Sequence, residues 1–243
     1  MRSVERAFDI LEIFADRREP LGLSEIASTL GIPVSTCFDL LRTLQSRGYL
    51  YEVGKHKTYF PTARWLEKST EIAASDQTLK RLQRSLASLR DETGETILLG
   101  KRLRDKVIYL SVAAGTHTIR YSTAVGELKP LHSSALGKAL LGAMPPKERE
   151  RLVNRLKLPR ITDLTITRRA KLMADIEAGQ SRGWFITRGE NVDEVMGIAV
   201  PFHFNSDVFA IAIAGPITRL DSNLPTYVKR LVATCKSAQM QRA

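Results

Sequence analysis

The sequence has few cysteines and histidines and no long apolar run. Its two cysteines, Cys37 and Cys235, form neither a CxxC pair nor a Cys/His spacing, so we expect neither a disulfide framework nor a zinc site. The four histidines show no ligand spacing either, and we expect no metal and no cofactor. No apolar stretch approaches the roughly 20 residues that cross a membrane, and no secretory signal is recognisable. A globular, cytoplasmic protein is therefore predicted.

The chain carries a formal net charge of +11, a property that many nucleic-acid-binding proteins share. Residues 94–243 contain most of the excess, with 23 basic against 13 acidic residues. Within the N-terminal part, residues 1–41 have 4 basic and 7 acidic residues, whereas residues 42–64 have 5 basic and 1 acidic residue. Net charge alone does not identify a nucleic-acid surface. If one exists, we expect it within residues 42–64, because basic residues are in excess there.

Three short helices are predicted in the first 46 residues. An apolar stripe at helical spacing marks the inward face of the first: Val4, Ala7, Phe8, Leu11 and Phe14. We expect Ser24 to cap the second helix, Gly31 to end it, and Pro33 to stand at the head of a third helix over 34–46. Two short helices joined by a glycine turn and packed on another helix form a helix-turn-helix.

The third helix is predicted to present polar side chains to a DNA groove. Its inward stripe is Cys37, Leu40, Leu41 and Leu44, and its outward set is Ser35, Thr36, Phe38, Asp39 and Arg42. Arg42 can donate to guanine O6 and N7, and Asp39 can accept from cytosine N4. Phe38 can contact a thymine methyl group. A helical module that only packs against other proteins remains the alternative.

A β-hairpin is predicted after Gly48. Residues 49–51 and 58–60 alternate as strands do, and the turn between them contains Lys55 and Lys57. Two lysines at a hairpin tip can lie along the phosphate backbone, where contacts add affinity without recognising sequence. A solvated tip without a partner is the plainer interpretation.

The remaining sequence predicts a linker helix and an α+β domain. Residues 62–93 are helical in pattern, with a break near residues 75–76, and they either support dimerisation or pack within the chain. Strands are then expected near 96–99, 107–112, 118–122, 184–187, 195–202 and 208–214, with helices near 134–143, 146–156, 168–182 and after 222. This order favours a mainly antiparallel sheet covered by helices.

In this domain we expect a binding pocket rather than a catalytic centre. Ser133 or Ser134 at a helix N-terminus would leave backbone N–H groups free to hold a carboxylate. His132 adjoins these hydroxyls, but neighbours in sequence seldom form a nucleophile–base pair. A small-molecule enzyme with an accessory N-terminal interaction module remains the alternative function, and a pure adaptor is a third.

Several motifs, in order and with suitable spacing, resemble the IclR (isocitrate lyase regulator) family of bacterial transcription regulators. The N-terminal match is SVERAFDILEIFADRREPLGLSEIASTLGIPVSTCFDLLRTLQSRGYL. The C-terminal matches are GELKPLHSSALGKALLGAMPPKERERL, SRGWFITRGE, GIAVP and AIAIAGPITRL. The motifs lie between residues 3 and 220, and the resemblance extends over nearly the whole chain.

The resemblance implies a winged helix-turn-helix over 1–62, a linker helix over 63–77 and a GAF-like effector-binding domain over 78–243. It also implies a homodimer or a dimer of dimers on double-stranded operator DNA, with a small-molecule effector. Relatives commonly have basic residues where this chain has Val34 and Asp39. Backbone affinity is therefore expected to depend more on Arg42, Arg47 and the hairpin.

The resemblance also implies the effector-binding positions. They are Thr118, Tyr121, Ala135, Leu136, Thr187, Val195, Gly197, Ala212 and Ala214. Some relatives place an acidic residue, a cysteine and serines at the last few of these, to bind a very small oxo-acid. Because this chain lacks those polar groups, we expect a larger and flatter ligand, such as an aromatic acid with Tyr121 against its ring. Ordinary apolar core is the alternative for these positions.

Overall fold

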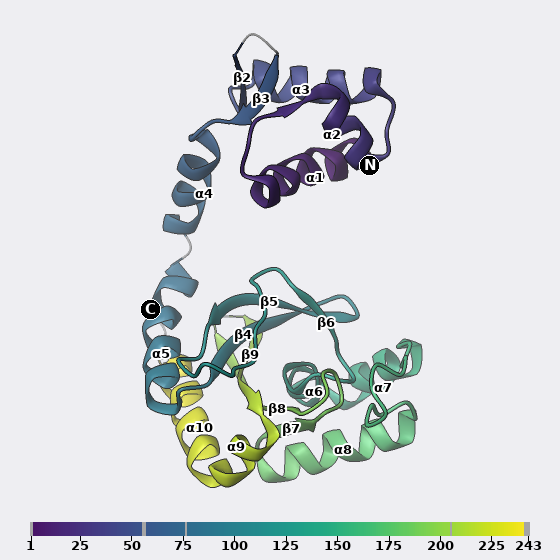
Figure 1. Cartoon of the computed structure of the whole chain (residues 1–243). Coiled ribbons are helices and arrows are strands. Elements are labelled where there is room, and N and C mark those ends of the chain that lie inside the picture. The colour runs from purple at the N-terminus through teal and green to yellow at the C-terminus, as the bar shows by residue number, and fades with distance from the viewer. Residues whose placement is uncertain (1, 55–56, 76, 205, 241–243) are drawn as a thin grey trace. The chain divides into compact units, whose positions relative to one another are not determined.

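The computed structural model describes residues 2–54, 57–75, 77–204 and 206–240. The chain forms two compact units, Met1–Asp76 and Gln77–Ala243, each with its own core (Figure 1).

The N-terminal unit combines helices with a small antiparallel sheet. Its elements are α1 (Arg2–Arg17), β1 (Leu21–Gly22), α2 (Leu23–Leu30), α3 (Val34–Ser46), β2 (Leu50–Val53), β3 (Thr58–Pro61) and α4 (Arg64–Ser75). The sheet order is β1-β3-β2, and Val53 pairs with Thr58 next to the hairpin turn. The predicted helix-turn-helix with an adjoining hairpin is confirmed.

The inward face of α1 differs from the predicted one. Ile10 and Phe14 are buried, whereas Val4 is 64% and Phe8 59% exposed. The sequence contains two overlapping apolar stripes, one through Phe8 and one through Ile10 and Ile13. Spacing cannot choose between them, because the choice depends on which side packs against α2, α3 and β3.

The two ends of α2 follow different rules. The helix begins one residue before Ser24, directly after Gly22, whose extended backbone belongs to β1, and no side chain caps it. The prediction that Ser24 caps this helix is therefore wrong. At the other end, Gly31 has φ 62°, and its N–H donates to the carbonyl of Ser28. The predicted left-handed glycine stop is confirmed.

The C-terminal unit is an α+β domain around a six-stranded sheet. Its elements are α5 (Gln77–Thr93), β4 (Thr96–Leu103), β5 (Lys106–Ala113), β6 (Leu128–Pro130), α6 (Ala135–Gly142), α7 (Pro146–Arg155), α8 (Arg169–Arg182), β7 (Phe185–Arg188), β8 (Val195–Phe204), β9 (Asp207–Pro216), α9 (Ile217–Ser222) and α10 (Leu224–Met240). The strand order is β6-β5-β4-β9-β8-β7, and every pair is antiparallel. The predicted fold class is confirmed.

One predicted strand is absent. Residues 114–127 form turns and irregular chain, and pairing resumes only at β6. The β-branched residues at 118–122 suggested a strand, but Thr118 and Ile119 are exposed. This segment runs along the α6 side of the sheet, where Tyr121 packs on the core.

The two faces of the sheet have different side chains. Along β9, Ile211 and Ile213 belong to the core beneath α5 and α10, whereas Ala210, Ala212 and Ala214 face α6. Figure 1 shows α5 and α10 on one side of the sheet and α6 to α8 on the other. Because side chains alternate along a strand, the isoleucines fill one face and the alanines leave space on the other.

Candidate functional site

The outer face of α3 carries most of the predicted DNA-contacting residues. Ser35, Phe38, Asp39, Arg42 and Arg47 are exposed, and Thr36 is half-buried. Cys37 and Leu41 are buried beneath them. Arg42 and Arg47 form no ion pair with any residue that the structure describes, so their guanidinium groups are available to an outside partner.

The hairpin turn is described only in part. Gly54 has φ 67°, and Lys57 is exposed with φ 49°. Lys55, the other predicted phosphate contact, lies outside the described residues. The turn thus presents at least one ammonium group beside the helix-turn-helix.

The end of α3 is joined to the start of α4 by contacts that sequence reasoning missed. Trp65 Nε1 donates to the carbonyl of Tyr49 at 3.0 Å, and the two rings lie 4.5 Å apart. The guanidinium of Arg64 lies 5.3 Å from the centre of the Tyr49 ring, and Thr62 Oγ1 donates to the carbonyl of Gly48 at 2.6 Å. A tryptophan in the first turn of a polar helix was the available signal. These contacts fix the orientation of α4 relative to the recognition helix.

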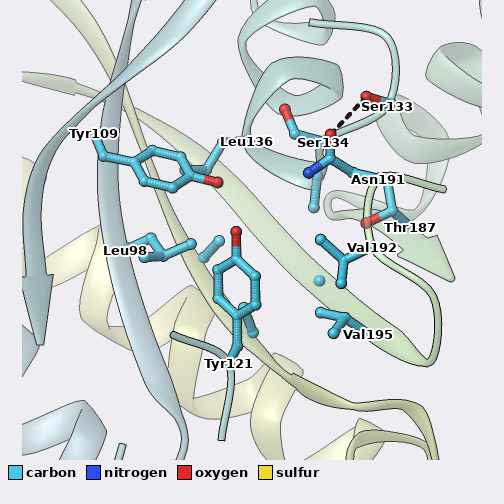
Figure 2. A pocket seen from close by; sticks show the side chains of 14 residues that line it. Leu98, Tyr109, Tyr121, Ser133, Ser134, Leu136, Thr187, Asn191, Val192 and Val195 are labelled. Atoms are coloured by element: carbon cyan, nitrogen blue, oxygen red, sulfur yellow. Dashed lines mark hydrogen bonds between the residues drawn. The ribbon is translucent and has the colours of Figure 1, made fainter. Parts of the chain in front are cut away.

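A cavity of about 40 Å³ lies between the sheet and α6 (Figure 2). Eight of the nine predicted effector-binding residues line it: Tyr121, Ala135, Leu136, Thr187, Val195, Gly197, Ala212 and Ala214. Thr118 is exposed and is not part of this lining. Six further lining residues were not predicted as contacts: Leu98, Tyr109, Ser133, Ser134, Asn191 and Val192. For the two serines the sequence predicted a helix N-terminus that could hold a carboxylate, not a direct side-chain contact.

Small residues create the space in this cavity. Gly197, Ala212 and Ala214 lie on adjacent strands, with Gly197 opposite Ala214 in the register. A Cβ added at Gly197 would lie only 3.0 Å from the Ala135 Cβ and 3.2 Å from Thr187 Oγ1. The glycine therefore allows α6 to approach the sheet, while the alanines keep the cavity floor open.

The N-terminus of α6 provides hydrogen-bond donors. Ser134 caps the helix, because its Oγ accepts from the Gly137 N–H at 3.1 Å and donates to the carbonyl of Pro130 at 2.9 Å. Ala135 and Leu136 occupy the first turn, where N–H groups lack acceptors within the helix. Both residues line the cavity, so this end can hold an anion.

A short strap, residues 188–194, forms one wall and is firmly anchored. Its Glu190 carboxylate contacts the buried Lys138 ammonium at 2.7 and 2.8 Å, and Lys138 also lies 2.7 Å from Asp175. Burial raises the pKa of Glu190, and the nearby Lys138 partly opposes this. Thr165 Oγ1 donates to the Glu190 carbonyl at 2.7 Å, and Ser133 Oγ donates to Asn191 Oδ1 at 3.1 Å. The strap is therefore a fixed wall.

The opposite wall is the irregular segment 114–127. Thr96 Oγ1 donates to the carbonyl of Tyr121 at 2.6 Å, and Arg219 donates to that of Ile119 at 3.0 Å. These side-chain contacts replace strand pairing. A cavity that holds benzene in another protein measures about 150 Å³. A ring-sized ligand therefore needs this wall to move outward.

The cavity is polar at its ends but uncharged. None of the described residues that line it is acidic, basic or histidine. Figure 2 shows the Tyr109 and Tyr121 hydroxyls pointing into the cavity from one side, with Ser133, Ser134 and Asn191 on the other. Burial, and then the neighbouring Tyr121, raise the pKa of Tyr109, which stays protonated. The lining suits a ligand with a flat apolar body and polar ends.

His132 and Ser133 do not form a nucleophile–base pair. The His132 Nε2 lies 3.1 Å from the carbonyl of Pro159, and Ser133 Oγ donates to Asn191 instead. Burial lowers the pKa of His132. Among the residues that the structure describes, no cluster of three or more His, Cys, Asp and Glu could hold a metal ion. Within the same residues, no helix is long and apolar enough to cross a membrane.

Two family models match the chain in succession. The IclR helix-turn-helix domain matches residues 3–54, and the C-terminal domain of bacterial transcriptional regulators of the IclR type matches residues 71–239. The HTH-type transcriptional regulator BhcR of Paracoccus denitrificans (strain Pd 1222) is 32% identical over 224 residues, which cover 90% of this chain and 79% of that protein.

Solved structures have the same fold. The IclR of Thermotoga maritima aligns with a TM-score of 0.84 at 23% identity and covers 99% of this chain and 98% of its own. An IclR homologue from Microbacterium hydrocarbonoxydans, complexed with 4-hydroxybenzoate, aligns with a TM-score of 0.79 at 20% identity, with 98% of both chains covered.

Proposed function

Since the chain belongs to the IclR family of bacterial transcriptional regulators, we propose that its DNA binding is controlled by an aromatic acid held in the α6 cavity. In this proposal α3 enters the major groove, and the β2–β3 hairpin contacts the phosphate backbone. The working form is a homodimer or a dimer of dimers in the cytoplasm. The C-terminal unit binds its ligand and does not transform it.

The observation that carries the effector proposal is the convergence of eight predicted positions on one cavity. The first turn of α6 offers N–H groups to a carboxylate, and Tyr121 offers an aromatic face. Leu98, Leu136 and Val192 surround the space between them with apolar surface. The acid 4-hydroxybenzoate, with which the Microbacterium relative is complexed, has such a ring and carboxylate.

Calorimetric titration of the full chain tests the ligand class. Benzoate and 4-hydroxybenzoate are expected to bind as the 114–127 wall moves outward. Glyoxylate is not, because Gly197, Ala212 and Ala214 offer no side-chain hydrogen-bond partners to its oxygens. Ala212→Leu should block both aromatic acids by filling the cavity floor, while operator binding in a mobility-shift assay stays unchanged. Tight binding of glyoxylate without binding of either aromatic acid would contradict the proposal.

A further inference from the structure

An asparagine on the fixed wall of the cavity uses only one half of its amide group. Asn191 lies on the strap 188–194, is half-buried and lines the cavity. Its Oδ1 accepts from the Ser133 hydroxyl at 3.1 Å, and Ser133 directly precedes the residue that caps α6. No residue that the structure describes accepts a hydrogen bond from its Nδ2. The Asn191 side chain therefore has free N–H groups beside the N-terminus of α6.

Ser133 determines which way this amide faces. Ser133 is fully buried, so its hydroxyl proton cannot be donated to water, and Asn191 Oδ1 is the acceptor that it has. With the amide turned over, Nδ2 would donate to Ser133, whose own proton would lose its acceptor at a cost in free energy. The nitrogen therefore points away from Ser133, and Figure 2 shows it directed into the cavity.

The backbone that carries Asn191 is held on both sides of the amide. Thr162 Oγ1 donates to the carbonyl of Gly189 at 2.6 Å, two residues before Asn191. The carboxylate of Glu190, the residue between them, contacts the buried Lys138 ammonium. The amide is thus placed before a ligand arrives, whereas the opposite wall must move to admit a ring.

Two kinds of donor meet at this end of the cavity. Ala135 and Leu136, in the first turn of α6, present backbone N–H groups, and Asn191 adds its side-chain N–H groups beside them. The side-chain oxygens of Asn191 and Ser134 already accept hydrogen bonds within the protein. A carboxylate, which only accepts, can satisfy these donors, and hydrogen bonds to an ionised acceptor are the stronger ones. A carboxamide has N–H groups of its own, and one side of it would oppose donor to donor.

We propose that Asn191 is a specificity-determining residue, whose Nδ2 donates to the carboxylate of the effector and makes the cavity select carboxylates over carboxamides. The inference rests on the proposed function, in which the carboxylate lies at the α6 N-terminus. The fixed strap then recognises the polar end of the ligand, and the opposite wall accommodates its apolar body.

Calorimetry of the full chain with benzoate and benzamide tests this role, because the two compounds differ only in the group at this end. The unmodified chain should bind benzoate about tenfold more tightly than benzamide. Asn191→Ala should lower benzoate affinity about tenfold and benzamide affinity less than about threefold. Asn191→Asp keeps the shape of the side chain and the acceptor for Ser133. It should reverse the preference, because the introduced carboxylate repels benzoate and accepts from the benzamide N–H.

Asn154→Asp is the matched control. It makes the same change of charge on the exposed surface of α7 and should keep the preference for benzoate. Urea denaturation shows which variants are folded, and Asn191→Ala decides alone if Asn191→Asp is not. An equal loss of both ligands in Asn191→Ala, or a preference for benzoate that survives in folded Asn191→Asp, would overturn the inference.

Hexanoate and hexanamide separate this inference from the aromatic proposal. If only the aliphatic pair binds, the aromatic proposal fails, while the role of Asn191 still requires a preference for hexanoate that Asn191→Asp reverses. If benzoate binds with a preference that does not depend on Asn191, the aromatic proposal stands and this inference fails. Binding by none of the four compounds would overturn both.

Discussion

The recognition face of α3 and the α6 cavity place their polar groups in opposite environments. On α3 and directly after it, Arg42 and Arg47 are exposed and form no ion pair with a described residue, so their charge is available to an outside partner. Around the cavity, the charged groups Lys138 and Glu190 are buried against each other, and the lining itself is neutral. Exposed charge provides long-range attraction to DNA, whereas a neutral cavity selects a ligand by shape and directed hydrogen bonds. Each prediction below changes one side of this contrast.

The largest effect is expected where a buried charge loses its partner. Lys138→Met leaves Glu190 and Asp175 uncompensated and should lower the free energy of unfolding of the C-terminal unit by about 3–5 kcal/mol. Lys68→Met removes an equally short 2.7 Å ion pair with Glu71 on the surface of α4 and should leave stability nearly unchanged. Urea denaturation of both variants measures the difference. Similar losses in the two would contradict the contrast.

Removal of the exposed Arg42 side chain should lower DNA affinity rather than the stability of the fold. Arg42→Ala is expected to cost about 1–3 kcal/mol of operator affinity, because a bidentate contact to a base edge is lost. Affinity for random DNA should fall much less. Titrations of operator and scrambled duplexes by fluorescence anisotropy give both values. An equal loss on the two duplexes would show that Arg42 contacts only the backbone.

Lowering the pH should destabilise the fold through His132, a buried residue, and so tests the buried side of the comparison. Because burial lowers its pKa, the unfolded chain binds the proton more readily than the folded one. The contribution of neutral His132 to stability is therefore present above its ordinary pKa of about 6.5 and is lost as pH falls below it.

His132→Gln provides the control for this effect, since Glu190, with its raised pKa, responds in the opposite direction in both proteins. Chemical denaturation at pH 7 and pH 5.5 should show a larger loss in the unmodified chain than in the variant. Identical losses would exclude His132 as a source of the pH dependence.

The smallest effect is expected at the hairpin tip. Lys57→Ala should weaken all DNA sequences alike, by about threefold at moderate salt, because a phosphate contact recognises no base. The slope of log affinity against log salt should become shallower by about 0.9. A loss confined to the operator would instead assign Lys57 to base recognition.

The sequence by itself determined the features that depend on local chemistry. Gly31 ends α2 because a left-handed residue is needed there, and the buried Cys37 and Leu41 turn the opposite side of α3 outward. The alternation of isoleucine and alanine along β9 similarly gives one face of the sheet large side chains and the other face small ones. Eight of the residues that line the cavity were also expected from the resemblance, and six of these stand within its quoted motifs.

Only the tertiary structure decided the features that depend on partners distant in sequence. Two apolar stripes of α1 were equally regular, and the packing of α2, α3 and β3 selected the one through Ile10. Tyr109 lies on a strand whose pattern indicates only burial, and Asn191 lies on a strap that periodicity does not describe. Asn191 lies at the cavity because Lys138 binds Glu190 of the same strap. Tyr109 faces a closed cavity because Thr96 holds the Tyr121 segment across from the strap. Local patterns set which side chains can face inward, and long-range contacts set what they meet there.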